Sequence, residues 1–219
     1  MSEIDVMIED INLWQTQMFA LNYPDHDAIK AELLEAIYSN QEQQQMPIES
    51  EVATDAKHGL YESKLDFLTQ PIPPIRQLRG FVEDMLSTVA TAVNQDFWPR
   101  GAIGTAEITE SWYHITQNGG YHDAHSHPNC SWCGIYYVDA GECEIVTRNG
   151  SNRFYDPRFC ADQYLDAGTA YINNNGFWDF QPTEGQIVIF PSYLKHSALP
   201  YFGQEDRVVI AFNSIIKLD

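Results

Sequence analysis

The sequence predicts a mainly β protein with helices on its N-terminal side, built as an antiparallel barrel or jelly roll. Two observations predict this class: helical apolar periodicity in the first hundred residues, and a change near residue 103 to short β-prone segments not separated by helices. These segments are rich in Ile, Val, Tyr, Phe and Trp, and clusters of Gly, Pro, Asn and Asp separate them. They are Ala106 to Ile115, Gly134 to Val138, Cys143 to Val146, Gln186 to Phe190 and Arg207 to Ile216.

Two amphipathic helices are expected before this β-rich part. The first follows Tyr23-Pro24-Asp25, and its apolar residues, Ile29 to Ile37, recur at helical spacing. The second opens after Pro73-Pro74 and carries one apolar stripe from Ile75 to Val93, which is typical of a helix lying on a sheet.

We expect one domain over residues 1–219, with helical support in 1–100 and the jelly-roll core in 101–219, because two helices alone would be marginal. Residues 41–70 show no sustained period. They form a long connection between the two helices and are a candidate lid over a binding site.

The charge balance excludes several classes of partner. The 219 residues contain 12 Lys and Arg against 31 Asp and Glu, so the net charge is −19, and nucleic acid or an anionic membrane is not expected as a partner. No apolar run approaches the roughly 18 residues of a membrane span. The acidic start lacks the features of a signal peptide, so a cytoplasmic location is expected. Oligomeric state cannot be read from the sequence.

The four cysteines, Cys130, Cys133, Cys143 and Cys160, are expected to be reduced thiols. A zinc site is the alternative. It is disfavoured because Cys130 and Cys133 precede and enter a predicted strand, where residues three apart point to opposite faces.

The densest functional signal is the segment from Gly119 to Pro128, where three histidines and an aspartate fall within six residues. In an extended chain alternate side chains share a face, with Cα atoms about 6–7 Å apart, so Asp123, His125 and His127 would point the same way. Two of them could bind one metal ion at roughly 2.1 Å. His122 would lie on the opposite face and is expected to be structural.

A third ligand should come from a distant strand. His196 is the best candidate, because it follows an apolar strand that opens at Gly185 and stops at Pro191. Ligands from two strand ends with open coordination positions describe a facial site of the non-heme Fe(II) type, although imidazole also suits zinc and copper. His26, His58 and His114 are expected to be ordinary surface or core residues.

Arg207 opens a very apolar strand and must find a partner, because an unpaired buried guanidinium is very costly. Its planar fork matches a carboxylate, which could belong to a cosubstrate or to an Asp or Glu of the protein.

Several blocks in order resemble the 2-oxoglutarate/Fe(II)-dependent oxygenases of bacteria and phages, within the prolyl-hydroxylase-like superfamily. The resemblance spans about residues 105–216. Cys133 replaces a serine that is usual in this family. The matching blocks are His125-Ser126-His127-Pro128, Cys133 to Val138, Tyr155-Asp156-Pro157-Arg158, Gly185 to Pro191 ahead of His196, and Arg207 to Asn213.

The resemblance implies a double-stranded β-helix of the cupin-like jelly-roll type that binds Fe(II). It implies that His125, His127 and His196 are the metal ligands, although the superfamily's usual carboxylate ligand is missing from position 127 and Asp123 could supply it instead. It further implies that Arg207 binds the distal carboxylate of 2-oxoglutarate and that Tyr137 assists. Asn213, six residues along the Arg207 strand, would line the same pocket.

The function implied is that of an oxidoreductase, a dioxygenase that uses Fe(II), 2-oxoglutarate and O2 to hydroxylate a small-molecule or peptide substrate. A cupin-type metalloenzyme that acts without 2-oxoglutarate would share the barrel and the histidines. A non-catalytic binding module whose site has decayed is the remaining alternative.

Overall fold

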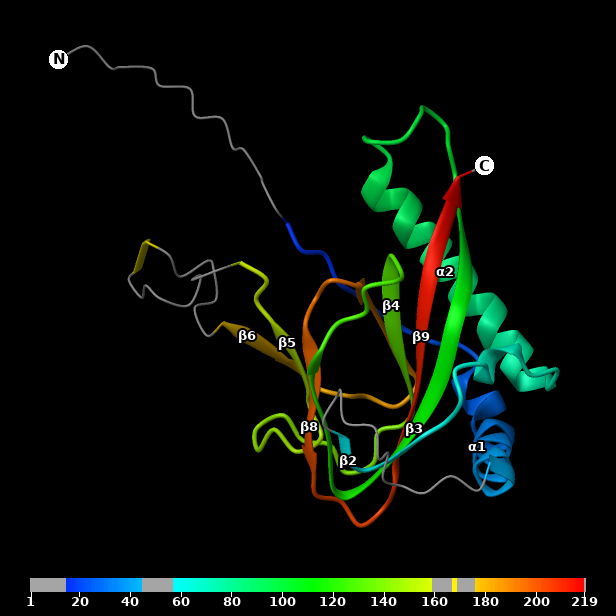
Figure 1. Ribbon diagram of the computed structural model, residues 1–219, viewed down its shortest axis with the longest axis vertical. Helices are drawn as coiled ribbons and strands as arrows, with labels where there is room; N and C mark the ends of the chain where they lie inside the picture. Colours follow the sequence, from blue (N-terminus) through cyan, green and yellow to red (C-terminus); the bar gives the residue numbers. More distant parts are fainter. Residues whose placement is uncertain (1–14, 45–56, 159–166, 169–175, 219) are drawn as a thin grey trace.

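The computed structural model describes residues 15–44, 57–158, 167–168 and 176–218. Within them the strands form a curled antiparallel sheet in the order β1-β7-β4-β9-β3-β8-β5-β6, and β2 pairs with β3 off this path. Figure 1 shows helices α1 and α2 on one side of the molecule, beside β3 and β9, with β5, β6 and β8 on the other. This half-barrel with two N-terminal helices confirms the predicted fold class.

The elements follow one another along the chain from residue 19 to residue 218. In order they are β1 (Phe19–Asn22), α1 (His26–Gln44), β2 (Lys57–Glu62), the 3₁₀ helix η1 (Phe67–Thr69), α2 (Pro73–Asn94), β3 (Gly104–His125), β4 (Trp132–Asp139), β5 (Asn152–Tyr155), β6 (Phe177–Phe180), β7 (Gln186–Pro191), β8 (His196–Tyr201) and β9 (Arg207–Leu218).

Both helices cover one face of the sheet, as their apolar stripes predict. Helix α2 starts with two prolines in its first turn, where the missing backbone N–H costs nothing. Its buried residues include Leu78 and Leu86, which join Tyr113, Ile210 and Phe212 in one apolar core. Full burial of each such leucine contributes about 1.5–3 kcal/mol.

Strand β9 is buried on both faces, and its side chains point alternately into two different environments. Val208, Ile210 and Phe212 belong to the core under the helices. Arg207, Val209, Ala211 and Asn213 alternate with them and line a cavity on the concave side of the sheet. Strand geometry therefore explains why a charged residue faces the interior of this half-barrel.

Strand β3 spans 22 residues and contains several register shifts in its pairings, two of which concern the site. The first lies between Ile108 and Glu110 in the pairing with β9. Ala106 and Ile108 on one side of this shift join the core under the helices, whereas Trp112 and His114 beyond it line the cavity. The second shift lies between His122 and His125 in the pairing with β8. Each extra residue moves the following side chains to the other face.

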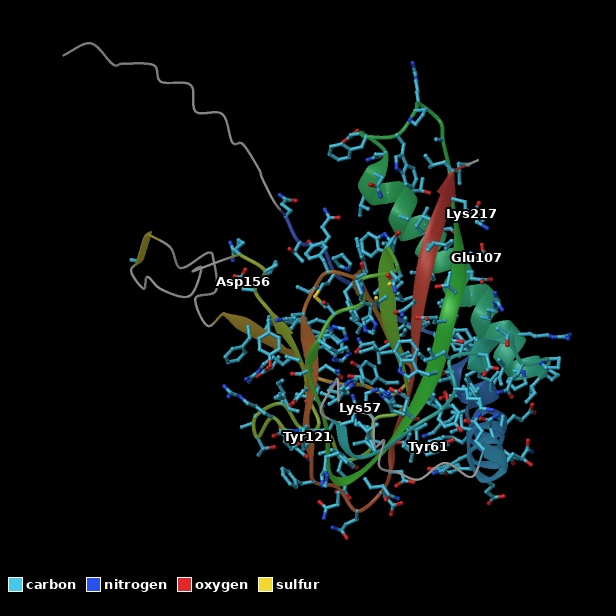
Figure 2. The ribbon with its side chains drawn as sticks, viewed as in Figure 1. Lys57, Tyr61, Glu107, Tyr121, Asp156 and Lys217 are labelled. Atoms are coloured by element: carbon cyan, nitrogen blue, oxygen red, sulfur yellow. The ribbon has the colours of Figure 1, made fainter. Side chains whose placement is uncertain are left out.

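An ion pair connects the outer ends of β3 and β9. Lys217 of β9 forms an ion pair with Glu107 of β3, and Figure 2 shows the two residues side by side near the C-terminal end of the sheet. Both side chains are exposed, so this pair contributes little stability.

Two sequence expectations are corrected. Cys143 to Val146 is not a strand: the Glu144 carboxylate accepts the backbone N–H groups of Val146 and Thr147 and holds a turn that leaves Val146 exposed. The connection over 41–70 contains strand β2, which pairs with β3.

The proposed lid stays a prediction, because residues 45–56 lie outside the described part of the chain. The division at residue 100 is likewise untested. Strands β1 and β2 nevertheless show that the first hundred residues supply strands as well as helices.

No helix in the described ranges combines the length and the apolar character needed to cross a membrane.

Candidate metal centre

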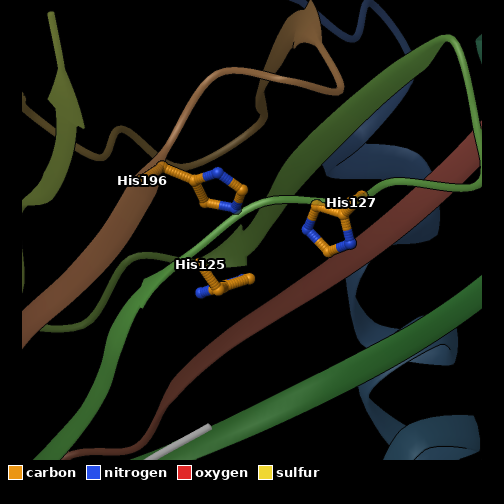
Figure 3. Close-up of side chains that lie close together, drawn as sticks. All are labelled: His125, His127 and His196. Carbon is orange, nitrogen blue, oxygen red and sulfur yellow. The ribbon is translucent and has the colours of Figure 1, made fainter. Parts of the chain in front are cut away.

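Three histidines from two strand ends meet at the cavity. His125 ends β3 and His196 begins β8, and the two are direct partners in the antiparallel register. His127 follows in the loop after β3, where its backbone N–H donates to the Ser192 carbonyl at 3.0 Å. One ring nitrogen from each residue lies within 4.8 Å of the others. Figure 3 shows the three side chains gathered around a common space.

Backbone carbonyls fix two of the imidazole rings in the tautomer that suits a metal. His125 Nδ1 lies 2.7 Å from the Asp123 carbonyl, and His196 Nδ1 lies 3.0 Å from the Leu194 carbonyl. A carbonyl oxygen only accepts, so each Nδ1 must donate its proton and each Nε2 is the unprotonated nitrogen. This is the outer-shell arrangement that metal-binding histidines usually have.

The Asp123 side chain lies outside this group. The residue is exposed, and the ligand atoms within reach of one another come from His125, His127 and His196. Regular alternation would have placed Asp123 beside His125. The register shift between His122 and His125 interrupts that alternation.

Two further histidines, His122 and His114, are connected to this group by ring contacts. The His122 ring stacks on His125 with centroids 3.9 Å apart, and His114 meets His122 edge-on at 5.6 Å. His114 Nε2 lies 2.7 Å from a Glu62 oxygen, which Lys57 also contacts at 2.6 Å. The expectation that His122 lies on the opposite face is therefore wrong, because His122 lines the cavity. His114 also lines the cavity, and it is buried and bonded to Glu62, as expected of a core residue.

Burial keeps the imidazoles of His114, His122 and His196 neutral. It lowers the pKa of His196 to about 3, with further lowering by His125, and it also lowers the pKa of His122 and His114. Burial alone would raise the pKa of Glu62, but hydrogen bonds from His114 and Lys57 outweigh it and hold that pKa at about 2. Neutral imidazoles are the form that binds metal ions.

A buried guanidinium lies in the same cavity. Arg207 is 3% exposed, and its Nη2 donates to Asn152 Oδ1 at 2.7 Å, while its Nε has no hydrogen-bond partner among the described residues. No carboxylate in that part of the chain forms an ion pair with it. The buried charge is thus only partly satisfied, which favours an anionic ligand over an internal ion pair.

Tyr137 and Asn152 hold this arginine in place. The Tyr137 hydroxyl donates to Asn152 Oδ1 at 2.9 Å, and the guanidinium carbon lies 5.6 Å from the centre of the tyrosine ring. Burial raises the pKa of Tyr137, so the hydroxyl keeps its proton. Asn152 is a site residue that the sequence did not indicate.

The opposite end of the cavity carries an unpaired donor and an unpaired acceptor. Asn213 Nδ2 donates to Glu110 Oε2 at 2.8 Å, which leaves its buried Oδ1 without a partner among the described residues. The Trp112 indole N–H is likewise buried and unpaired there. Asn213 lies six residues after Arg207 on the same strand, a span of roughly 20 Å. The contact of Asn213 with the cosubstrate bound by Arg207 stays a prediction, and this spacing disfavours it.

Among the described residues, no cysteine belongs to the candidate metal group. Within the described residues, the ligand atoms close enough to share an ion include no cysteine, and Cys130, Cys133 and Cys143 are free thiols. The expectation that Cys130 and Cys133 point apart is wrong: their sulfur atoms lie 3.4 Å apart, because Cys130 precedes β4 and strand alternation does not apply to it. Cys160 lies outside the described residues.

The residues present fit a facial metal ion and a diacid: three converging imidazoles, two of them with a defined tautomer, and a buried guanidinium with an orphaned N–H. An antiparallel half-barrel with such a site is characteristic of the non-heme iron oxygenases. Residues 110–213 match the family model described as "Putative 2OG-Fe(II) oxygenase". This match confirms the resemblance seen in the sequence over residues 110–213, and the family that the model describes is one of enzymes.

Solved structures share the fold at low sequence identity. A prolyl-4-hydroxylase from Pseudomonas putida is 14% identical, with a TM-score of 0.53 over 90% of this chain and 92% of that chain. AviO1 from Streptomyces viridochromogenes is 16% identical, with a TM-score of 0.58 over 91% and 90%. The α-ketoglutarate-dependent carbocyclase SnoK of nogalamycin biosynthesis is 11% identical, with a TM-score of 0.61 over 93% and 80%. No curated protein sequence matched the chain.

Proposed function

We propose that this protein is an oxidoreductase that binds Fe(II) and 2-oxoglutarate and hydroxylates a small-molecule or peptide substrate with O2. One observation carries the proposal: three imidazoles converge within 4.8 Å in a cavity that also holds a buried arginine without an ion-pair partner among the described residues. Such a pairing provides for a metal ion and for an organic dianion in one pocket.

The three histidines would hold the metal through one nitrogen each and leave positions open for the cosubstrate. When bound, Fe(II) and 2-oxoglutarate supply the O2-dependent decarboxylation that releases succinate and CO2 and oxidises a substrate C–H bond. His125 and His196 are oriented in advance by their Nδ1 hydrogen bonds, so their rings need not reorganise on binding.

Arg207 would bind the distal carboxylate of 2-oxoglutarate. Its Nη2 is held by Asn152, and Asn152 is held in turn by the Tyr137 hydroxyl, so Nε is left to face the ligand. In this arrangement Tyr137 positions the arginine through Asn152, and the tyrosine acts indirectly.

The substrate would enter at the end of the cavity that carries Trp112 and Asn213. The Trp112 N–H can donate and the Asn213 Oδ1 can accept, so a substrate group with both functions, such as an amide, fits this end. The orientation of the Asn213 amide is set by Glu110, whose carboxylate only accepts. The net charge of −19 disfavours a polyanionic substrate.

The test is succinate formation by anaerobically purified protein after addition of Fe(II), 2-oxoglutarate and O2, with a panel of peptides and small amides. The His196→Ala variant is the control for the metal site. Succinate above that control, increased by at least one member of the panel, supports the proposal. Metal content no higher than in the control, or no effect of 2-oxoglutarate on the metal-loaded protein, refutes it.

Arg207→Ala separates the oxygenase from a cupin-type enzyme that acts without 2-oxoglutarate. The oxygenase variant keeps its metal and loses 2-oxoglutarate affinity, whereas the cupin-type enzyme would show no 2-oxoglutarate affinity to lose.

A further inference from the structure

The cysteine pair stands directly beside the candidate metal centre. Cys130 lies in the loop before β4 and Cys133 lies on β4 itself, where its side chain lines the cavity that holds the histidines. Their sulfur atoms lie 3.4 Å apart. A disulfide requires about 2.0 Å, so small rotations of the two side chains would close the gap.

Hydrogen bonds connect Cys130 to the loop that carries His127. The Cys130 thiol lies 3.6 Å from the His127 carbonyl and donates to it. Ser192 accepts from the His127 backbone N–H at 3.0 Å, and its hydroxyl donates to the Cys130 carbonyl at 2.7 Å. A change in the position of the Cys130 sulfur therefore acts on the segment that positions a metal ligand.

Cys143 provides a contrast. It is also partly buried, but its thiol donates to the Gly150 carbonyl at 3.4 Å and contacts no other described thiol. A disulfide between neighbours is thus favoured at one pair among the described cysteines.

We propose that Cys130 and Cys133 form a reversible disulfide when a peroxide oxidises them, and that this modification loosens metal binding at His127. The Cys130 thiolate attacks the peroxide, the O–O bond breaks, and a sulfenic acid forms with release of water or an alcohol. The Cys133 sulfur then attacks the sulfenic sulfur, the S–S bond forms, and a second water leaves. Two thiols are oxidised by two electrons in all, and one peroxide is reduced.

Disulfide formation removes the S–H that donates to the His127 carbonyl. The loop that carries His127 then loses one of the hydrogen bonds that hold it, so this ligand is positioned less firmly. The inference goes beyond the proposed function. It rests on that function only for the metal at the histidines, because the disulfide itself can be detected without any metal.

The first experiment treats the metal-free full chain with hydrogen peroxide and measures its intact mass and its disulfide-linked peptides. We expect a loss of about 2 Da that dithiothreitol reverses, with Cys130 and Cys133 in one linked peptide. The loss should persist in Cys143→Ser and be absent in Cys130→Ser and Cys133→Ser. No such loss in the wild type, or a linkage through another cysteine, would overturn the proposal.

The second experiment compares Mn(II) affinity of the reduced and oxidised chain by electron paramagnetic resonance. Mn(II) is the probe because it prefers thiolate less than zinc or cobalt do. Oxidation should weaken Mn(II) binding at least tenfold in the wild type and in Cys143→Ser. Equal affinities in the two redox states overturn the link to the metal. Absence of Mn(II) binding in both states refutes the metal centre and this link, while the mass change still decides whether the disulfide forms.

Discussion

Replacing Arg207 with methionine should separate binding of the cosubstrate from stability of the fold. The guanidinium is 3% exposed and has no ion-pair partner among the described residues, so the ligand-free protein contains a poorly compensated buried charge. Methionine has similar length and no charge. It leaves Asn152 Oδ1 satisfied, because the Tyr137 hydroxyl still donates to it.

The expected magnitudes differ in sign. Replacing a buried charge with an apolar side chain of similar volume is commonly neutral or stabilising by about 1–4 kcal/mol. Loss of a buried charge pair with the ligand costs about 2–5 kcal/mol, which weakens 2-oxoglutarate binding roughly 30-fold to 4,000-fold. The same substitution should therefore leave unfolding of the ligand-free protein unchanged or shifted upward, and nearly abolish the response to 2-oxoglutarate.

Thermal unfolding of the Mn(II)-loaded protein with and without 2-oxoglutarate measures both quantities. A ligand at about 100 times its Kd adds about 2.7 kcal/mol, which corresponds to roughly 5–11 °C in a chain of this size. We expect that increase in the wild type, little or none in Arg207→Met, and a partial one in Arg207→Lys, which keeps the charge and loses the fork. A marked fall in Tm of ligand-free Arg207→Met would refute the reasoning, because it would show that the guanidinium is a structural partner in the ligand-free fold.

Four further substitutions test the rest of the site. His127→Ala should lower the metal content found by elemental analysis, whereas Asp123→Asn should leave it unchanged, and equal losses would show that both residues are ligands. Tyr137→Phe removes the hydrogen bond to Asn152 and should cost about 0.5–1.5 kcal/mol of 2-oxoglutarate binding by calorimetry; unchanged affinity would exclude the positioning role. The pKa of Glu62 is about 2, below its ordinary 4.5, so its stabilisation is complete above pH 4.5 and is lost as the pH falls toward 2. The stability lost in Glu62→Gln, measured by urea unfolding, should thus shrink over that range, and a deficit independent of pH would contradict the assignment.

Much of the fold could be predicted because apolar periodicity reports burial directly. The stripe from Ile75 to Val93 became α2, and the alternation that starts at Arg207 became β9. Strand β2 was missed because Lys-His-Gly-Leu-Tyr-Glu carries charges at both ends and a glycine in the middle, and only pairing with β3 makes it a strand.

The site residues that can be recognised by their residue type were predicted. Those whose orientation depends on strand register were missed. The three histidines could be named because imidazoles close together in sequence, and one at a later strand end, suit a metal. The orientation of His114 and His122 could not be predicted, because register shifts in β3 change which face each residue occupies, and nothing in the sequence marks a shift. The sequence did offer one signal for the role of His114: it precedes the histidine cluster on the same long strand.

At Thr109, β3 has one residue more than its partner β9, so the alternation of its side chains between the two faces of the sheet changes there. Upstream of it Ala106 and Ile108 face the core under the helices, and downstream Trp112 and His114 face the cavity while Tyr113 takes the core side. A deletion at Thr109 would turn Ala106 and Ile108 outward and Glu107 toward the helix, while Trp112 and His114 would keep their aim. The bulge therefore decides which of the alternating side chains of β3 face the cavity and which face the helices.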